Sequence, residues 1–432
     1  MPSAEPAVPK RAVRNLLLSS AIGTVVEWYD FFAFVTASAL VFDRVFFPTA
    51  APLRAVLLAL MTYAVGFVTR PLGGLVFGVL GDRHGRKRVL VWSLVLMGVA
   101  TVGVGLVPGY ATIGVAAPVL LLVLRLVQGF AVGGEVGGAL LLVCESLDRT
   151  RRGFWAAWPQ IGGPAGNLLV AGVFAVLTAS LTTAQLLSWG WRVPFLLSGL
   201  LIGVGVWMRT SVEESPVYRA YAARRASMPR TSLAATLAAR WREMLTVFLV
   251  KAGENALFYV FTTFFVVYVT KVLHRPASLA LTSTAIASAV EVATVFAAGA
   301  LSDAIGRRPV TAAGLVAAAV WTFALFPLTA TGGPTMVVLA AAVGGLCHGL
   351  IVGGMSAFFV ELFPTAARYT GYSAGYQLAS VASGAVAPII GVKLLARYDS
   401  SVPVSIYATA MALPALAALW RARETRATDL SA

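Results

Sequence analysis

The sequence predicts an all-α integral membrane protein with twelve transmembrane helices in two pseudo-symmetric six-helix bundles. Two observations predict this class: the hydropathy of the chain and an internal repeat. Of its 432 residues, 59% are hydrophobic and only 12% are charged, and the mean hydropathy is +0.83. A soluble domain of this length has too little core to bury so much apolar surface, so its solvent must be lipid.

The internal repeat is a short charged stretch that separates two long apolar runs in each half. Residues 81–89 read GDRHGRKRV, and residues 302–310 read SDAIGRRPV. The copies match at a constant offset of 221 positions: Asp82 and Asp303, Gly85 and Gly306, Arg86 and Arg307, Lys87 and Arg308, Val89 and Val310. Two copies in register indicate two homologous halves. In each copy we expect glycine to allow a tight reversal and aspartate to cap a neighbouring helix.

Twelve apolar runs are long enough to span a membrane at about 20 residues each. The first six lie near residues 15–41, 53–80, 89–107, 115–142, 155–180 and 191–209. The second six lie near residues 244–271, 278–301, 309–330, 335–360, 369–395 and 402–420. They divide the chain into an N-terminal tail (1–14), an N-terminal bundle (15–209), a linker (210–243), a C-terminal bundle (244–420) and a C-terminal tail (421–432).

The basic residues predict the orientation of these spans. With the N-terminus inside, 23 Lys and Arg fall on cytoplasmic segments, 7 on outer segments and 3 within spans, which accounts for all 33. This bias follows the positive-inside rule, so we expect a multi-pass membrane protein with both termini cytoplasmic. It also explains the net charge of +15 without a nucleic-acid partner. The two cysteines, in opposite halves, support neither a disulfide framework nor a metal site.

A cytoplasmic gate is predicted where acidic helix ends meet the repeated basic loops. Glu145 follows the fourth span and Glu361 follows the tenth. They are natural ion-pair partners for Arg86 and Arg307, and such pairs can hold one state closed and release it in another. The predicted gate residues are Asp82, Arg86, Glu145, Asp303, Arg307 and Glu361.

Charged residues inside the first-half spans are candidates for proton coupling, because each costs about 2.5–3.5 kcal/mol at a helix centre unless it has a partner or a function. Glu27 and Asp30 lie three residues apart, on one helical face near the middle of the first span. Arg125, in the fourth span, is the cation we expect to partner them. Glu135 lies nearer the cytoplasmic end and is ambiguous. The alternative is that both acids only balance cations on facing helices.

The second-half spans add charged and polar groups to a predicted substrate cavity. Lys251 and Glu254 lie three residues apart and can neutralise each other, while His348 can either relay protons or serve as a hydrogen-bonded packing residue. Glu291 is a further acid in the eighth span. The residues we predict for the cavity are Trp28, Tyr29, Gln128, Gln160, Asn167, Lys251, Glu254, Asn255, His348, Tyr376 and Gln377.

Seven segments, spread over essentially the whole chain, carry a resemblance to a known family: GTVVEWYDFFAF, RPLGGLVFGVLGDRHGRKRVL, RLVQGFAVGGE, GWRVPF, VEESP, KAGEN and ELFPTAARYTG. The chain resembles the major facilitator superfamily, and within it the metabolite:proton symporters of the bacterial inner membrane. The stretches VVEWYDFFAFVTASALVFDRVFFP, RLVQGFAVGGEVGGALL and GYQLASVASGAVAPII are most similar to the shikimate permease branch. The resemblance implies two six-helix bundles around a central cavity, with Asp82 and Arg86 in a cytoplasmic gating loop and Arg125 as the buried arginine associated with proton coupling. Lys251 stands where an arginine is common, which puts a bidentate carboxylate clamp there in doubt.

The resemblance implies a proton-coupled importer of a small organic acid, shikimate-like or another carboxylate. A zwitterion such as proline or betaine is the alternative substrate, and a proton-driven exporter is a further one. The spans contain no nucleophile–base set, so we expect no enzyme activity. We also expect no cofactor beyond the proton gradient, no metal, and a monomer whose partners are its substrate, protons and membrane lipid.

Overall fold

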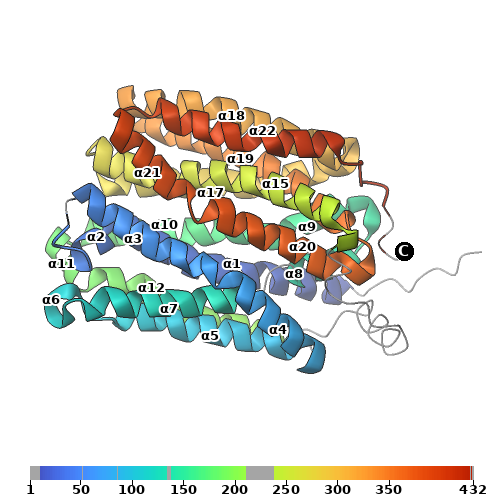
Figure 1. The fold of residues 1–432 in the computed structure, drawn as a ribbon, viewed down its shortest axis with the longest axis horizontal. Coiled ribbons are helices and arrows are strands. Elements are labelled where there is room, and N and C mark those ends of the chain that lie inside the picture. Colours follow the sequence, from blue (N-terminus) through green and yellow to red (C-terminus); the bar gives the residue numbers. More distant parts are fainter. Residues whose placement is uncertain are drawn as a thin grey trace, which may run out of the picture.

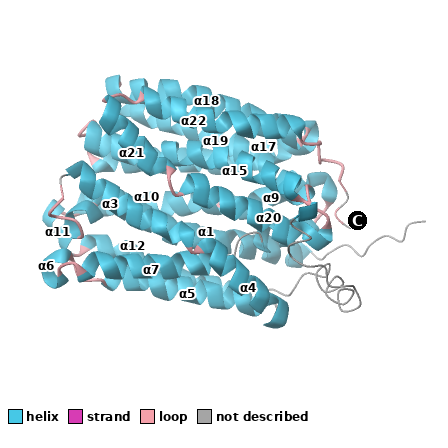
Figure 2. Ribbon diagram, in the orientation of Figure 1, coloured by secondary structure: helices cyan, strands magenta, loops and turns pink. Residues whose placement is uncertain are grey.

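All the elements described in the computed structural model are helices, and most run along one common direction between two loop-bearing ends (Figures 1 and 2). The structure describes residues 10–50, 52–84, 86–133, 138–210, 238–428 and 430. Most of the predicted linker, 210–243, lies outside these residues. Helices are expected in an apolar solvent, because backbone N–H and C=O groups without water must pair with each other.

The N-terminal half contains long helices interrupted by short ones and turns. They are α1 (Lys10–Leu40), α2 (Phe42–Val45), α3 (Pro52–Val68), α4 (Arg70–His84), α5 (Arg86–Leu106), α6 (Tyr110–Ile113), α7 (Ala116–Gly133), α8 (Gly138–Ser146), η1 (Arg149–Arg151), α9 (Arg152–Gln160), α10 (Gly162–Ser180), α11 (Thr183–Ser188), η2 (Gly190–Arg192) and α12 (Val193–Thr210).

The C-terminal half repeats this plan with longer unbroken helices. They are α15 (Trp241–Tyr259), η3 (Val260–Phe264), α16 (Phe265–Val267), η4 (Tyr268–Val272), α17 (Ala277–Ile305), α18 (Arg307–Thr331), α19 (Pro334–Glu361), α20 (Thr365–Ala379), η5 (Ser380–Gly384), α21 (Ala387–Tyr398) and α22 (Val402–Arg421). The segments η3, η4 and η5 are π-helical turns within the seventh and eleventh spans.

The two halves lie side by side, the N-terminal half below and the C-terminal half above in Figure 1. Helix α10 packs against α1 of its own half and against α17 of the other half. Helix α9 packs against α17 and α19, and α3 and α4 contact α21 and α20. Side chains on these facing helices therefore meet in the middle of the molecule.

Several predicted spans are broken where the sequence removes a backbone donor. Pro71 follows the break between α3 and α4, and Pro164 lies in the first turn of α10, just after the break that follows α9. Proline cannot donate the helical N–H, so it kinks or restarts a helix. Thr69 stabilises the first break, because its hydroxyl donates to the carbonyl of Leu126 in α7 at 2.8 Å.

Eleven helical stretches of the described chain are long and apolar enough to cross a membrane. They coincide with eleven of the twelve predicted spans. In the third predicted span, 89–107, the apolar stretch is the shorter Val91–Leu106. The predicted fold class is thus confirmed.

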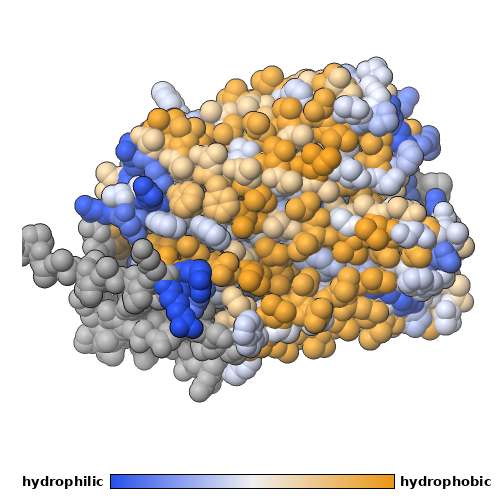
Figure 3. All heavy atoms as spheres, turned by 180° about the vertical axis from the view of Figure 1, so that it is seen from behind, coloured by the Kyte–Doolittle hydropathy of each residue, from blue (hydrophilic) through white to orange (hydrophobic). Residues whose placement is uncertain are grey.

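On the face shown in Figure 3, apolar side chains cover the middle of the molecule, and hydrophilic residues gather toward the two ends. Large apolar side chains are highly exposed, among them Val99 at 67%, Leu200 at 70% and Leu413 at 60%. A soluble protein rarely exposes so much contiguous apolar surface, whereas a lipid-facing surface requires it. The chain is therefore a multi-pass membrane protein.

Glycines allow the backbones of α3, α4 and α7 to touch. A Cβ atom on Gly129 would lie 1.7 Å from the carbonyl oxygen of Gly66, and one on Gly133 would lie 2.0 Å from that of Arg70. Without a hydrophobic effect in lipid, such close packing is a main source of helix association. This contact also places Arg125, one turn before Gly129, inside the N-terminal half.

We expect Gly129→Val to destabilise the protein by more than the roughly 1–3 kcal/mol typical of overpacking, because backbone atoms cannot move aside as side chains do. Gly172→Val in α10 is the matched control, since a Cβ atom there meets nothing within 4 Å. Thermal unfolding of both variants in detergent measures the difference. Equal midpoints for the two variants would contradict the close backbone contact between α3 and α7.

Candidate functional site in the core of the bundle

A chain of hydrogen bonds connects Arg125 to Asp30 inside the N-terminal half. The Arg125 Nη1 group donates to Gln128 Oε1 at 3.2 Å. Gln128 Nε2 donates to the Thr101 hydroxyl at 2.7 Å, and that hydroxyl lies 3.0 Å from Asp30 Oδ2. The Ser198 hydroxyl donates to the other carboxylate oxygen of Asp30. The sequence predicts a pairing of Arg125 with the acids of the first span, and the contact to Asp30 runs through two intermediate side chains.

This chain lies beside a small cavity, which Glu27, Asp30, Arg70, Arg125 and Gln128 help to line. The Arg125 guanidinium lies 4.5 Å from the centroid of the Phe34 ring and 5.3 Å from that of Tyr63. Aromatic faces attract a cation electrostatically, which offsets part of the cost of burying it. Glu27 and Asp30 therefore share one cavity with Arg125, as the sequence predicts, while Glu135 lies outside the described residues.

The C-terminal half holds a second cluster, built from α15, α17 and α19. Lys251 Nζ lies 2.6 Å from Glu254 Oε2, so the predicted ion pair is confirmed. His348 bridges two acids: its Nε2 lies 3.0 Å from Glu254 Oε1 and its Nδ1 lies 2.7 Å from Glu291 Oε1. Each of these four residues is at most 4% exposed.

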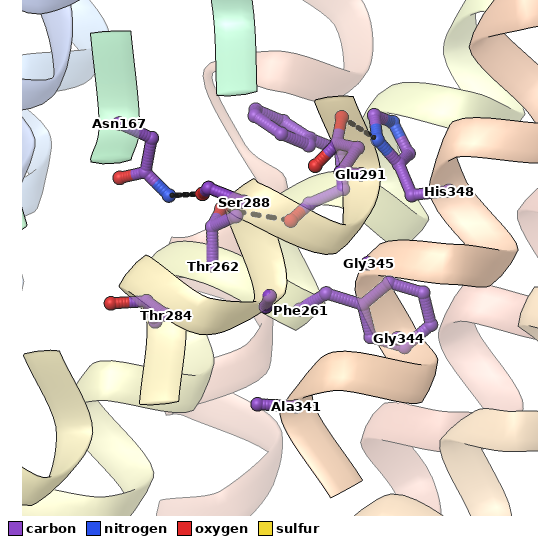
Figure 4. Close-up of a pocket in the computed structure, with 12 residues that line it drawn as sticks. Asn167, Phe261, Thr262, Thr284, Ser288, Glu291, Ala341, Gly344, Gly345 and His348 are labelled. Carbon is purple, nitrogen blue, oxygen red and sulfur yellow. Dashed lines mark hydrogen bonds and ion pairs between the residues drawn. The ribbon is translucent and has the colours of Figure 1, made fainter. Parts of the chain in front are cut away.

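A second cavity lies between the halves, next to this cluster (Figure 4). His348 and Glu291 line it from one side, and Asn167 of α10 reaches it from the other half. Asn167 Nδ2 donates to the Ser288 hydroxyl of α17 at 3.0 Å, which ties the two halves together at this depth. Both of these cavities are small.

The other residues predicted for the cavity fall into three groups. Asn255 and Gln377 are buried, and within the described chain the Asn255 Nδ2 atom and both amide atoms of Gln377 lack hydrogen-bond partners. Trp28 and Gln160 are half-buried, and Tyr376, also half-buried, covers Lys251 with its ring at 4.6 Å. Tyr29 is 2% exposed and donates to the Pro194 carbonyl at 3.0 Å, so we assign it to packing instead of the cavity.

One end of the bundle, which we call the basic end, carries residues 303–308 and 361–368. Here Arg307 binds Glu361 with two nitrogens, each at 3.2 Å, so this predicted ion pair is confirmed. Arg152 of the N-terminal half reaches the same carboxylate at 2.9 Å. Glu361 is fully buried and thus joins both halves. Fork-shaped guanidinium contacts of this kind are the stronger class of ion pair.

Two further contacts at the basic end cross between the halves. The Asp303 carboxylate accepts the backbone N–H groups of Gly153 and Phe154 at 2.8 and 2.9 Å, so it caps α9 as the sequence predicts for this loop. Glu145 pairs with Arg368 at 2.9 Å. The side chains of Asp82 and Arg86 lie outside the described part of the chain, so the predicted pairing of Glu145 with Arg86 stays a prediction.

The C-terminal tail takes part in this network, which the sequence analysis missed. The Thr425 hydroxyl donates to Glu361 at 2.7 Å. The carbonyls of Thr428 and Leu430 accept from Arg152 and Arg368 at 3.1 and 3.0 Å. Every residue has a backbone carbonyl, so the sequence cannot predict which carbonyls bind these arginines. Only the side-chain hydroxyl of Thr425 could have indicated a contact of the tail.

Glu424 anchors the tail to the N-terminus of α18. Its carboxylate accepts N–H groups from four residues at 2.9–3.2 Å: Arg307, Arg308, Thr425 and Arg426. Burial acts to raise the pKa of Glu424, but these four donors outweigh burial and hold the pKa below its ordinary value of 4.5.

The opposite end of the bundle, around residues 41–47 and 268–275, has its own contact between the halves. Lys271 Nζ lies 2.5 Å from Asp43 Oδ2, which joins the C-terminal half to α2. The sequence analysis missed this pair, because both residues look like ordinary loop charges. Polar contacts among the described residues thus connect the halves at both ends.

Comparison with known proteins shows to which class of protein this chain belongs. The family described as "Sugar (and other) transporter" matches residues 16–242, and the Major Facilitator Superfamily model matches residues 258–431. The inner membrane metabolite transport protein YhjE of Escherichia coli is 38% identical over 431 residues, covering 98% of this chain and 97% of that protein. The shikimate transporter of E. coli is 36% identical, covering 89% and 88%. The proline/betaine transporter of E. coli is 32% identical, covering 86% of this chain and 76% of that protein.

Solved structures show the same fold. A partially occluded inward-open conformation of the xylose transporter XylE from E. coli matches with a TM-score of 0.73 at 19% identity, covering 98% of this chain and 100% of that one. The matched families and the relatives are transporters, not enzymes. The chain belongs to the major facilitator superfamily, among its bacterial metabolite transporters, which confirms the resemblance seen in the sequence motifs.

Glu361→Gln should open the basic end, because it leaves Arg152 and Arg307 buried without their common counter-charge. Breaking a buried pair costs about 3–5 kcal/mol. Thermal unfolding measures this loss, and alkylation of Cys144, which is 2% exposed and adjacent to Glu145, measures the opening in a Cys347→Ala background. Glu243→Gln is the control, since Glu243 belongs to an exposed ion pair with Arg240. Unchanged stability and alkylation in Glu361→Gln would contradict its role.

Glu424→Gln should lower the unfolding temperature at neutral pH, and this difference should fade in acid. The folded-state pKa is depressed, so the carboxylate stabilises the fold fully above its unfolded value near 4.5. That stability is lost as the pH falls through the folded pKa. Unfolding midpoints of both proteins between about pH 7 and pH 3 test this. A difference that stays constant over this range would show that the charge of Glu424 is not what matters.

Proposed function

We propose that this chain is a proton-coupled symporter that imports a small carboxylate metabolite by alternating access. The observation that carries the proposal is the buried chain from Asp30 through Thr101 and Gln128 to Arg125, beside a cavity in the N-terminal half. The Asp30 carboxyl group can take up and release a proton in this position. The hydrogen-bond chain transmits its protonation state to the Arg125 guanidinium, which can bind an anionic substrate.

The coupling follows from the hydrogen-bond inventory of Thr101. Its hydroxyl has a single proton and lies 3.0 Å from Asp30 Oδ2 and 2.9 Å from the Met97 carbonyl. When Asp30 is ionised, that proton is best placed toward the carboxylate. When Asp30 is protonated, the hydroxyl can turn to Met97. This rotation of the Thr101 hydroxyl alters its hydrogen bond with Gln128, and thereby the hydrogen bond between Gln128 and Arg125. Proton binding at Asp30 and substrate binding near Arg125 therefore influence each other reciprocally.

Charge balance gives the direction of this coupling. Glu27, Asp30 and one anionic substrate together carry one more negative charge than Arg125 and Arg70, which line the same cavity, can offset. Protonation of one carboxyl removes the excess in a medium where unpaired charge is expensive. Proton and substrate therefore favour each other, which is the requirement for symport.

The substrate class is inferred from the cations and from relatives. Arg125 and Lys251 favour a carboxylate. The Asn255 Nδ2 atom and the Gln377 amide, which lack hydrogen-bond partners within the described chain, can serve hydroxyl or carboxyl groups of a small polar molecule. The shikimate transporter among the relatives is named for a substrate of this kind.

A zwitterion is the second candidate. Lys251 and Glu254 present opposite charges side by side, and Trp28 and Tyr376 offer aromatic faces to a quaternary ammonium. The proline/betaine transporter among the relatives is named for such substrates. An exporter has no specific support.

The orientation proposed is the one that the basic residues predict. The basic end then faces the cytoplasm, together with both termini, and the Lys271–Asp43 pair faces outward. The relative YhjE is named as an inner membrane protein, which agrees with this location. Alternating access then consists of opening one set of inter-half contacts while the other stays closed.

Uptake into proteoliposomes tests the substrate and the coupling together. A panel of labelled carboxylates and betaines is offered with and without an imposed pH gradient, acidic outside. We expect gradient-driven accumulation of a carboxylate. Accumulation of betaines alone would favour the second candidate, and accumulation against an opposite gradient would indicate export.

Asp30→Asn should abolish pH-driven accumulation while substrate–substrate exchange persists, because asparagine mimics the protonated carboxyl without changing its shape. Arg125→Ala should weaken both, because it leaves buried carboxylates unpaired. The measurement is uptake with and without the gradient, beside counterflow from preloaded vesicles.

Asp399→Asn is the matched control for Asp30→Asn. Asp399 is exposed and caps α21 with a φ of 48°, a conformation that asparagine also tolerates. It should transport like the unmodified protein. If Asp30→Asn accumulates substrate at the unmodified level, Asp30 is not the coupling group, and Glu27 is tested next.

A further inference from the structure

The proposed coupling in the N-terminal half leaves a buried histidine in the C-terminal half without a function. His348 has a carboxylate oxygen at each ring nitrogen, Glu291 at 2.7 Å from Nδ1 and Glu254 at 3.0 Å from Nε2. Figure 4 shows the imidazole of His348 turned toward Glu291 at the edge of the cavity between the halves.

The two contacts require more protons than a neutral histidine has. A neutral imidazole carries one N–H, and its other nitrogen presents a lone pair. Two ionised carboxylates offer only lone pairs as well. Short contacts at both nitrogens therefore need two protons, so the described geometry holds one proton beyond the neutral ring and the two ionised acids.

The surrounding charges make this extra proton necessary. From α15, Lys251 pairs with Glu254, and from α20 the Tyr376 ring covers Lys251. Glu291 reaches in from α17. With the extra proton, one lysine, one imidazolium and two carboxylates sum to zero; without it, the cluster carries one net negative charge. A buried, unbalanced charge is costly, so the proton is held as long as the site is closed to water.

The cluster lies where the halves separate. Ser288 accepts from Asn167 of the other half, and Glu291 is three residues further along α17, on the same helical face. Asn167, Ser288, Glu291 and His348 line one cavity. When the contact between α10 and α17 opens, this cavity admits water, and the imidazolium can pass its proton to that water and keep a single N–H.

An aromatic layer separates this cluster from the chain around Asp30. The Phe258 ring lies 4.7 Å from the His348 ring and 6.2 Å from the Trp28 ring, and Trp28 in turn lies 5.4 Å from Phe31. None of these rings relays a proton efficiently. Protonation at His348 is therefore a separate event from protonation at Asp30.

We propose that Glu254, His348 and Glu291 form a second proton-binding site, which exchanges its proton when the α10–α17 contact opens. The protonation of this site is independent of what the chain transports. Its contribution to coupling rests on the proposed symport.

The protonation can be read directly, because the chain has only three histidines. His84→Gln and His274→Asn leave His348 as the single imidazole; asparagine suits position 274, where φ is 50°. Nitrogen-15 NMR of histidine-labelled protein at about pH 7.5 should show both ring nitrogens protonated, although a free imidazole with its pKa near 6.5 is mostly neutral there. A neutral tautomer would overturn the proposal.

Glu291→Gln in the same background supplies the matched comparison, because it keeps the shape of the site and removes one negative charge. Its imidazole should be neutral at the same pH. If the ring stays doubly protonated, the charge of Glu291 does not hold the proton, and the proposed site is wrong.

The contribution to coupling is measured as the proton-to-substrate ratio, from the membrane potential that just stops net flux in proteoliposomes. His348→Gln should lower this ratio by one relative to the unmodified protein, and Glu291→Gln should do the same if His348→Gln does not fold. An unchanged ratio overturns the coupling role. If no tested compound is transported, the proposed function fails while the NMR result still decides the proton site.

Discussion

The cost of placing charge in an apolar medium controls this structure. Among the described residues, each buried charged cluster contains its own counter-groups. Asp30 has hydroxyl donors and a polar path to Arg125, Lys251 has Glu254, and Glu361 has Arg152 and Arg307. A change of one proton or one bound anion upsets this balance by a full charge, and the cheapest response is to let water in. Charge balance thus links chemistry at the core to the opening of the ends.

The contact between α10 and α17 can turn a change of charge in the core into a movement of the two halves. Asn167 and Ser288 join the halves at the depth of the cavity, while ion pairs join them at both ends. Close packing makes each half rigid, as Gly129 against Gly66 illustrates, so a half moves as one body. When one contact between the halves is lost, rigid halves separate along the whole of that end of the bundle.

The sequence predicts what depends on composition and on local spacing. Hydropathy locates the spans, the repeated loop predicts two halves, and the three-residue spacing of Lys251 and Glu254 predicts their pair. Of the contacts between residues far apart in the chain, the repeated loops predict the pair Arg307–Glu361, but most others leave no local pattern. Glu291 lies 57 positions from His348, and nothing in its own span indicates that the two meet. Asp43 with Lys271, and the carbonyls of the tail with Arg152 and Arg368, escape for the same reason.

The polar contacts between the halves are more numerous and more deeply buried at the basic end than at the opposite end. Among the described residues, the basic end joins the halves through Arg152–Glu361, Arg368–Glu145 and the Asp303 cap of α9. Within the described part of the chain, the opposite end has one ion pair between the halves, Lys271–Asp43, whose lysine is 21% exposed and therefore weakened by solvent. Opening the opposite end breaks fewer and weaker contacts, so an empty transporter should rest open on that side. If that side faces outward, as the basic residues predict, the resting state presents its site to substrate outside the cell, which is the state an importer needs between cycles.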